Sequence, residues 1–362
     1  MAREERERIE QIPDLGIIPA EQANVDESEV MVALLNMGGP RTNQEVCRFL
    51  KRVFCDPIIM RFPLSPILQP LFAWLLVTLR GKKTEQRYQL IGGGSPIFDS
   101  TRKQTQALQE ELRKRGRKVD ITFSFNYSVP FPEDTIAEIR SLGKKYILPL
   151  SLYPHYSKAT TGSNLFYLKQ AAQKLYPQVK FLESAPYYLH DGYIQGFVDR
   201  IYAQIESTES LDDFYLIFSA HGLPLYFLME GDPYPFQICQ TVSKILGKLN
   251  RRDRWVISYQ SAVGPLKWLK PSTESIIDAL ASRGIKRVLI VPIAFVTDHI
   301  ETLCEIDMEY RKLANDLGIT DFRMSKALEC YPAFITALAD SVEASLPRKS
   351  VQVSHPQKIL VP

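Results

Sequence analysis

The chain has 362 residues, of which 45% are hydrophobic and 23% are charged, and its formal net charge at pH 7 is +3. This length fits two domains of ordinary size, and this composition is typical of a soluble globular protein, while the small net charge argues against nucleic acid as a partner. The five cysteines show no C-x-x-C spacing, which fits reduced thiols in the cytoplasm better than a disulfide framework.

The two ends of the chain are predicted to be loose. Residues 1–29 are charged and contain no apolar core, so they are not a secretory signal, and we expect a disordered N-terminal extension there. Residues 347–362 are expected to form a loose C-terminal tail.

The first predicted elements are a strand at 30–35 and a helix at 42–54, and an unusual apolar segment follows them. Residues 67–79 carry no charge, but a helix that spans a bilayer needs about 20 residues, so the segment is too short to span one. Basic residues flank it. The segment fits a buried helix, the mouth of an apolar pocket, or a patch that lies on an anionic membrane surface.

Apolar strand-like runs alternate with helical patterns along the rest of the chain. They lie at 121–125, 147–150, 214–218, 255–259 and 287–293. Near-continuous apolar strands separated by helices are typical of parallel sheets that are covered on both faces.

An internal repeat is visible among these elements. Residues 121–150 and 255–293 share one strand–turn–helix–strand pattern, and 31–40 is similar to 214–224. The repeat predicts an α/β fold of two similar Rossmann-like domains, whose parallel sheets are flanked by helices, with the active site in the cleft between them.

The repeat also suggests where the two domains begin and end. We place the first at 30–176 plus 324–346, with a ligand-binding lip at about 60–83. The second is placed at 177–323 and carries the histidine and the carboxylates described next.

Polar residues cluster directly after the predicted strands. They include Asn36, Asn126, Tyr153, His221, Gln260 and Ser261, and the run 298–301. Ligands of open parallel sheets bind at the carboxyl ends of the strands. This shared position favours a functional site over a solvated surface.

The run that begins at Asp298 is the most informative of these. Glu301, Glu305 and Glu309 follow at helical spacing, so their carboxylates rise by roughly 6 Å per step along one helix face. Asp298 and Glu301 alone also have the spacing of a helix capping box, and the remaining carboxylates fit a solvated face. A line of carboxylates that leads from a strand end suits a path for a metal cation.

His221 ends an apolar run and is followed by a glycine and a proline-containing loop, so we expect its ring to open onto the cleft. Facing Glu301 from another strand end, it would form a pair able to move protons or to hold a divalent metal. Residues that suit a flat, large, apolar ligand accompany the pair, although each also fits an ordinary core: Met37, Tyr88, Tyr127, Trp268 and Phe295.

A series of motifs resembles the ferrochelatase family. They are LLNMGGP (34–40), GGGSPI (92–97), YPHYSKATTGS (153–163), FSAHGLP (218–224), GDPYP (231–235), YQSAVGPLKWL (259–269) and VPIAFVTDHIETLCEID (291–307). The match runs in order from about residue 30 to about residue 345. It implies a chelatase-like fold and a lyase that inserts ferrous iron into a porphyrin, the last step of haem biosynthesis.

The resemblance implies roles for individual residues. The residues implied to be catalytic are His221, Glu301, Tyr127 and His299. The residues implied to bind or conduct metal are His221, Glu301, Asp298, Glu305 and Glu309. The residues implied to contact the substrate are Met37, Arg80, Lys83, Tyr88, Ser261, Trp268 and Phe295. Whether His221 or Glu301 binds iron, and which of them takes protons, stays open.

The identity of the porphyrin follows from one position. Members that use coproporphyrin carry a tyrosine where this chain has Met37, so protoporphyrin IX is the expected substrate. The alternatives are a coproporphyrin III ferrochelatase, a chelatase for cobalt or nickel, and a haem or metal carrier without catalytic activity.

The resemblance implies ferrous iron as a substrate and no tightly bound cofactor. Lys158 stands where some members carry a cluster-binding cysteine, and no cysteine follows Cys330, so no iron–sulfur cluster is expected. Asn126 replaces an arginine of the animal members.

The resemblance also implies a location and partners. Residues 67–79 resemble a lip that faces the membrane. The protein is therefore expected in the cytoplasm, held peripherally at the cytoplasmic face of the membrane and in contact with the enzyme that oxidises protoporphyrinogen.

Overall fold

The computed structural model describes residues 17–19, 25–59, 69–264 and 266–347. The disorder predicted for 1–16, 20–24 and 348–362, and the 60–68 part of the predicted lip, lie outside these ranges. Within the extension predicted to be disordered, Ile17–Ile18 forms strand β1 and Glu27–Glu29 forms a short 3-10 helix, η2. The prediction is wrong for these residues, because β1 pairs with β5 and the Asp26 side chain caps η2.

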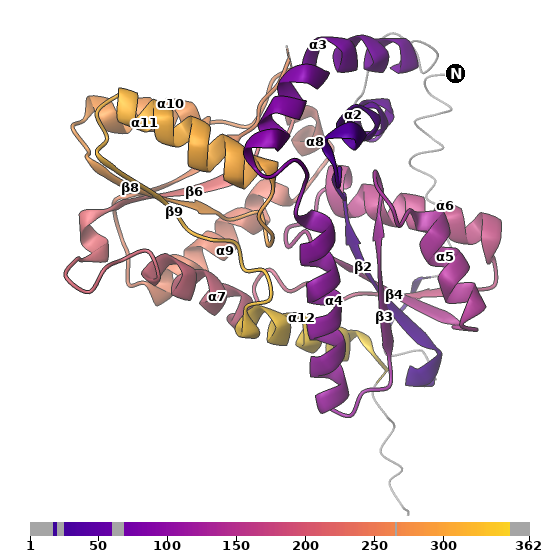
Figure 1. The fold of residues 1–362 in the computed structure, drawn as a ribbon. Coiled ribbons are helices and arrows are strands. Elements are labelled where there is room, and N and C mark those ends of the chain that lie inside the picture. The colour runs from indigo at the N-terminus through magenta and orange to yellow at the C-terminus, as the bar shows by residue number, and fades with distance from the viewer. Residues whose placement is uncertain (1–16, 20–24, 60–68, 265, 348–362) are drawn as a thin grey trace, which may run out of the picture.

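Two parallel sheets, one in each half of the molecule, form the centre of the fold (Figure 1). The first has the order β1-β5-β4-β2-β3, with β2 (Val30–Asn36), β3 (Asp120–Phe125), β4 (Tyr146–Ser151) and β5 (Lys180–Leu182). The second has the order β7-β6-β8-β9, with β6 (Tyr215–His221), β7 (Trp255–Gln260), β8 (Arg287–Pro292) and β9 (Asp321–Met324).

Apart from the edge strand β1, the two sheets have the same strand order. In each half the first strand along the chain lies between the second and the third, and the fourth lies beyond the third. The matching units are those of the sequence repeat, namely β3-α5-β4 and β7-α10-β8, where α5 is Pro132–Ser141 and α10 is Thr273–Ser282. The predicted pair of similar Rossmann-like halves is confirmed.

Helices cover both faces of each sheet (Figure 1). One face of the first sheet packs against α5 and α6 (Ser163–Leu175), and one face of the second packs against α10 and α11 (Arg311–Asp316). The remaining faces share one continuous apolar core with α4 (Ile97–Lys114), α7 (Asp191–Tyr202), α9 (Tyr234–Lys248) and α12 (Pro332–Ser345). The halves are therefore joined by a common core.

The remaining helices and the loops carry most of the predicted site. They are η3 (Asn43–Glu45), α2 (Val46–Cys55), α3 (Gln69–Leu90), η4 (Lys158–Gly162), η5 (Leu211–Asp213), α8 (Leu225–Met229) and η6 (Glu301–Tyr310). In the part of the chain that the structure describes, no helix combines the length and the apolar character needed to cross a membrane.

The structure moves one predicted domain boundary. The sequence placed the start of the second domain at 177, but β5, at Lys180–Leu182, pairs with β4 in the first sheet. A strand this short shows no periodicity that would assign it to either half. The first half therefore extends at least through Leu182.

A buried carboxylate holds the two halves together close to the predicted site. Asp232, only 2% exposed, accepts hydrogen bonds from the Ser157 hydroxyl at 2.9 Å and from the Lys158 N–H at 2.8 Å. It also accepts one from the Tyr234 N–H at 3.1 Å, in its own half. The motifs GDPYP and YPHYSKATTGS thus meet at a contact between the halves, where a buried charge is satisfied by several donors.

Candidate active site

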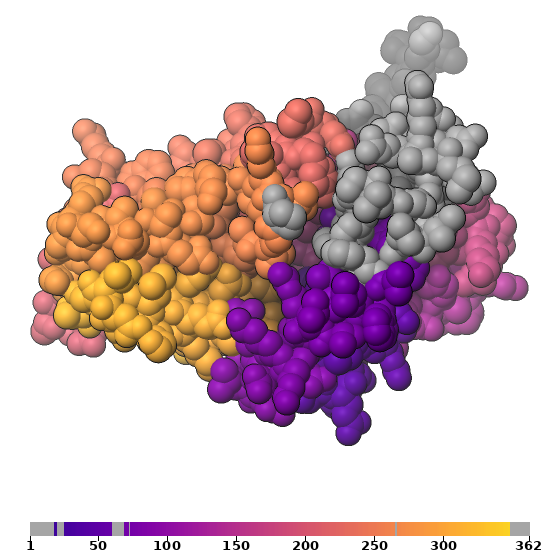
Figure 2. Space-filling model, turned by 90° about the horizontal axis from the view of Figure 1, so that it is seen from above, coloured from indigo at the N-terminus to yellow at the C-terminus, as the bar shows by residue number. Residues whose placement is uncertain are grey.

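The predicted site lies where strand ends of the two halves approach each other. β2 ends at Asn36, while β6 and β7 end side by side at His221 and Gln260, which are register partners. Seen from above, a recess separates the second half, drawn in orange and gold, from the indigo part of the first half (Figure 2). This is the arrangement expected for a ligand site between two α/β halves.

Side chains of the first half reach Glu301 of the second half. Burial raises the pKa of Tyr88 on α3, and the nearby Glu301 carboxylate raises it further. The same two causes raise the pKa of Tyr153, which follows β4 and also has a hydrogen bond with the Met37 backbone. Tyr88 and Tyr153 therefore lie near the Glu301 carboxylate at the beginning of η6, and the Met37 backbone lies next to Tyr153.

His221 presents a nitrogen lone pair at the end of β6. Its Nδ1 lies 2.7 Å from the carbonyl oxygen of Gly222. A carbonyl oxygen only accepts, so in the neutral ring Nδ1 carries the proton and Nε2 keeps its lone pair. No group within the described residues makes a hydrogen bond to Nε2. His221 can therefore accept a proton from a ligand, or bind a cation, through Nε2.

His299 and Glu301 form a hydrogen-bonded pair. His299 is 6% exposed, its Nδ1 lies 3.0 Å from the Thr297 carbonyl oxygen, and its Nε2 lies 3.2 Å from Glu301 Oε2. Because Nδ1 donates to the carbonyl, the contact between Nε2 and Oε2 is a hydrogen bond only when it holds a proton. With a proton on either of these two atoms, the pair can pass that proton on singly.

Aromatic rings connect the two histidines. The ring centroid of Phe295 lies 6.4 Å from that of His221 and 4.5 Å from that of His299. Trp268 packs on Gly222, because a Cβ added there would come within 3.2 Å of Trp268 Cε3 and within 2.7 Å of the Gln260 carbonyl oxygen. Only glycine fits this close approach, which accounts for the glycine after His221.

The helix of carboxylates differs from the predicted α-helix. η6 is a π-helix of 10 residues that runs directly into α11. π-helices are rare, are mostly single turns, and occur frequently at functional sites. The i, i+4, i+8 spacing of Glu301, Glu305 and Glu309 still follows one helix, but the rise per step expected for an α-helix does not apply.

Each carboxylate of this helix has a partner. Glu305, 8% exposed, accepts hydrogen bonds from the Ser261 N–H at 2.9 Å, the Ser261 hydroxyl at 2.6 Å and the Tyr310 hydroxyl at 2.7 Å. Glu309 is exposed and pairs with Arg87 of α3. Ser261, predicted to contact the substrate, and Glu305, predicted to bind or conduct metal, are therefore bonded to each other. Among the described side chains, no group of three or more His, Cys, Asp or Glu could hold a metal ion.

Asp298 belongs to the turn that precedes η6. Its N–H donates to Glu329 Oε1 at 2.8 Å, and its Oδ1 accepts from the Thr302 hydroxyl at 3.1 Å. The possible capping box with Glu301 is not formed, because η6 begins at Glu301 itself with Ile300 as its N-cap residue. Glu329 holds the turn from a left-handed backbone conformation, φ 50°, which non-glycine residues rarely adopt away from functional sites.

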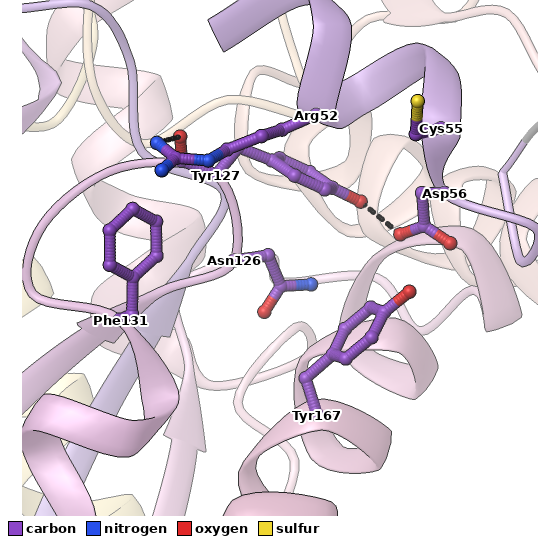
Figure 3. A pocket seen from close by; sticks show the side chains of 7 residues that line it. All are labelled: Arg52, Cys55, Asp56, Asn126, Tyr127, Phe131 and Tyr167. Carbon is purple, nitrogen blue, oxygen red and sulfur yellow. Dashed lines mark hydrogen bonds between the residues drawn. The ribbon is translucent and has the colours of Figure 1, made fainter. Parts of the chain in front are cut away.

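Met37 and Tyr127 lie next to each other in the first half. The Met37 carbonyl accepts a hydrogen bond from the Tyr127 N–H at 3.1 Å. Tyr127 is 4% exposed and its hydroxyl donates to Asp56, so the predicted catalytic tyrosine has no free hydroxyl in this structure (Figure 3). Tyr127 borders a pocket of about 320 Å³ whose other lining residues are Arg52, Cys55, Asp56, Asn126, Phe131 and Tyr167.

The two cationic residues predicted to contact the substrate lie on the same helix as Tyr88. Arg80 and Lys83 are both exposed on α3, whereas Tyr88, one to two turns further on, is 4% exposed. This places charged side chains in solvent and an aromatic one inside, as expected for a helix at the mouth of an apolar site.

His155 does not belong to the site, although it also follows a strand. It is 1% exposed, its Nε2 lies 2.9 Å from the Thr241 hydroxyl, and burial lowers its pKa to about 3. The ring is therefore neutral at physiological pH and serves the core.

Three residues of the site were not predicted from the sequence as functional. Tyr153 was noted only as a polar residue after a strand, and Glu329 and Arg87 were not singled out. Glu329 and Arg87 lie 31 and 222 positions away from the residues that they bind. Since no local pattern links residues so far apart, only the position of Tyr153 directly after β4 gave a signal.

Comparison with known proteins agrees with these observations. Residues 29–346 match the sequence model of the family described as Ferrochelatase. A ferrochelatase of Cyanothece sp. is 41% identical over 334 residues, which cover 90% of this chain and 86% of the relative. A ferrochelatase of Gloeobacter violaceus is 40% identical over 323 residues, which cover 88% of this chain and 98% of the relative.

A solved structure shares the fold at much lower sequence similarity. SirB from Bacillus subtilis with Fe3+ has a TM-score of 0.51 and 13% identity, covering 87% of this chain and 95% of that chain. At this identity the likeness shows the fold alone, and it agrees with two halves built on parallel sheets.

Proposed function

This chain belongs to the ferrochelatase family, and from that premise we propose that it inserts ferrous iron into protoporphyrin IX to give protohaem. Membership of the family establishes an enzyme of haem biosynthesis that inserts metal into a porphyrin. Beyond family membership, we propose ferrous iron as the metal, protoporphyrin IX as the porphyrin, a lyase as the enzyme class, and the residues that carry out the reaction.

The observation that supports catalysis most strongly is that His221 and Glu301 both lie next to Gln260 at the end of β7. His221 is the register partner of Gln260, and the Gln260 amide donates to the Glu301 backbone carbonyl at 3.0 Å. Insertion of a divalent metal displaces two protons from the pyrrole nitrogens, so the site needs proton acceptors near the metal. His221 offers the lone pair of Nε2, and Glu301 offers the carboxylate oxygen that does not face His299. A carrier that only binds and releases its cargo needs neither group.

The two groups differ in charge, and this suggests how they divide the work. A neutral imidazole with a free lone pair is suited to take up a pyrrole proton. A carboxylate is suited to draw a dication toward the ring, and a proton taken up between Glu301 and His299 can be passed on. In this proposal His221 is the proton acceptor and Glu301 guides the ferrous ion.

The side chains around the predicted site suit an apolar macrocycle. Met37 supplies a polarisable thioether, and Trp268 and Phe295, both half-buried, supply aromatic surface beside His221. Arg80 and Lys83 suit the two propionates of protoporphyrin IX, whereas the four propionates of coproporphyrin III would require more cations. These features favour protoporphyrin IX.

The test is anaerobic metal insertion followed by absorbance, with ferrous iron and either protoporphyrin IX or coproporphyrin III. We expect rapid conversion of protoporphyrin IX and slow conversion of coproporphyrin III. Preference for coproporphyrin III would overturn the choice of substrate but keep the enzyme class. Binding of both porphyrins without turnover would instead identify a carrier.

We also propose that α3 contacts the surface of a membrane, at its cytoplasmic face. The apolar residues exposed along the first half of α3 are Leu71 (63%), Trp74 (58%), Leu75 (44%) and Leu79 (70%). Their exposure argues against a buried core helix, and their helical spacing, with Arg80 and Lys83 nearby, is typical of a segment that lies on an anionic bilayer. The enzyme that oxidises protoporphyrinogen remains a predicted neighbour there.

Vesicle binding tests this surface. The full chain is expected to sediment with vesicles that contain anionic lipid, and the double variant Trp74→Ser, Leu79→Ser is expected to stay in solution, because most of the apolar contact is lost. Leu142→Ser is the matched control, since Leu142 is 55% exposed but lies at the end of α5. Equal sedimentation of all three proteins would contradict the proposal.

A further inference from the structure

Glu309 carries the last carboxylate of η6, and both of its oxygens already accept hydrogen bonds from an arginine. Arg87 Nε donates to Glu309 Oε1 at 2.7 Å, and a second guanidinium nitrogen, Nη2, donates to Glu309 Oε2. The planar guanidinium of Arg87 therefore binds both oxygens of Glu309 in a bidentate ion pair, the strongest arrangement available to these two side chains. The side chains of Arg87 and Glu309 are 30% and 45% exposed, so part of the contact is shielded from solvent.

The partners of the three carboxylates of η6 differ in kind. Glu301 faces a histidine, whose proton can leave, and Glu305 faces hydroxyls and a backbone N–H, which carry no charge. Arg87 cannot lose its proton in a protein, so the positive charge next to Glu309 is permanent. A dication that approached Glu309 would have to meet this charge or displace it.

We propose that Arg87 removes Glu309 from the path of the metal substrate, so that the metal reaches the site through the inner carboxylates only. Arg87 is thus a residue that determines the metal route. The proposal deepens the function proposed above, since it concerns how a metal substrate approaches η6. It also revises the expectation that Glu309 conducts metal.

A second neighbour shows what Arg87 would prevent. Cys304 is 1% exposed and its Sγ lies 3.8 Å from Glu309 Oε1, on the same turn of the π-helix. A thiolate and a carboxylate at this separation could capture a soft or borderline divalent metal once the guanidinium is removed. Arg87 therefore prevents Cys304 and Glu309 from binding a metal together at the outer end of η6.

Arg87 also joins the two halves of the molecule. It lies on α3 of the first half, and α3 is in contact with η6 of the second half. The residue after Arg87 is Tyr88, which lies near Glu301. The ion pair thus fixes α3 against η6 next to the predicted porphyrin site, and this fixed position keeps the guanidinium on Glu309.

The test is a titration of the porphyrin-free full chain with Co²⁺ alone, under anaerobic conditions, followed by absorbance. Arg87→Gln is expected to bind Co²⁺ about tenfold more tightly than the wild-type chain, since a unit positive charge next to the ligand is lost. A near-ultraviolet band of cobalt–thiolate charge transfer, absent from the wild type, is expected in this variant. The double variant Arg87→Gln, Glu309→Gln is expected to lose the gain.

Arg87→Lys serves as the matched control, because it keeps the positive charge but loses the bidentate hydrogen bonding of the guanidinium. It is expected to bind Co²⁺ as the wild type does. Equal Co²⁺ affinity of the wild type and Arg87→Gln, a gain that persists in the double variant, or a gain in Arg87→Lys would each overturn the proposal. The titration needs no porphyrin turnover, so its failure is distinct from a failure of the proposed insertion activity.

Discussion

The His221→Ala variant is expected to bind protoporphyrin IX as the wild-type chain does, but to insert ferrous iron about 10²–10⁴-fold more slowly. Its ring is the group whose Nε2 lone pair is free to take a pyrrole proton, while Nδ1 is tied to the Gly222 carbonyl. Because His221 ends β6 and is half-buried, its loss should leave the sheet intact. Anaerobic insertion rates and porphyrin fluorescence titrations measure the two effects separately.

A second histidine provides the control for this prediction. His190 caps α7 and pairs with Asp340 of α12, away from the strand ends that carry the site. His190→Ala is therefore expected to lose some stability through its cap while retaining the insertion rate. Insertion at the native rate by His221→Ala would remove His221 from the catalytic residues.

The Glu301→Gln variant is expected to show a comparable loss of insertion, about 10²–10⁴-fold, because an amide neither attracts a dication nor accepts a proton as a carboxylate does. Glutamine keeps the size of the side chain. The substitution also leaves the backbone carbonyl of residue 301, which accepts a hydrogen bond from the Gln260 side-chain amide at 3.0 Å, so η6 should form normally. The Michaelis constant for ferrous iron should rise while porphyrin affinity is retained. Steady-state kinetics at varied iron and fixed porphyrin measure this difference.

Asp307→Asn is the matched control on the same π-helix. Asp307 pairs with Arg311 of α11 and does not contact the strand ends of the site. We expect this variant to insert iron at the wild-type rate. If Asp307→Asn and Glu301→Gln lost activity equally, the effect would belong to the helix as a whole, and the role given to Glu301 would be wrong.

The sequence predicted the fold because its signals are local and repeated. Apolar runs mark β2, β3, β4, β6, β7 and β8 directly, and the repeat of 121–150 in 255–293 fixes the likeness of the halves before any contact is known. Strands β1, β5 and β9 were missed because two to four residues carry no clear periodicity, and each gains its hydrogen bonds from a neighbour far along the chain.

The site could be predicted in position but not in detail. His221 and Glu301 were found because they directly follow strands or begin a helix after one, and strand ends meet at the same edge of a parallel sheet. That Ser261 binds Glu305, and that Tyr127 binds Asp56, depends on contacts over 44 and 71 positions. The π-helical form of η6 follows from its packing and hydrogen bonding rather than from a residue pattern.

The measurement that tests the account most directly is a crystal structure of the full chain with metal-free protoporphyrin IX. We expect a macrocycle in the recess between the halves, with one face toward Met37, the other toward His221 Nε2, and its propionates near Arg80 and Lys83. A macrocycle bound elsewhere, or with His221 and Glu301 both remote from the pyrrole nitrogens, would contradict it.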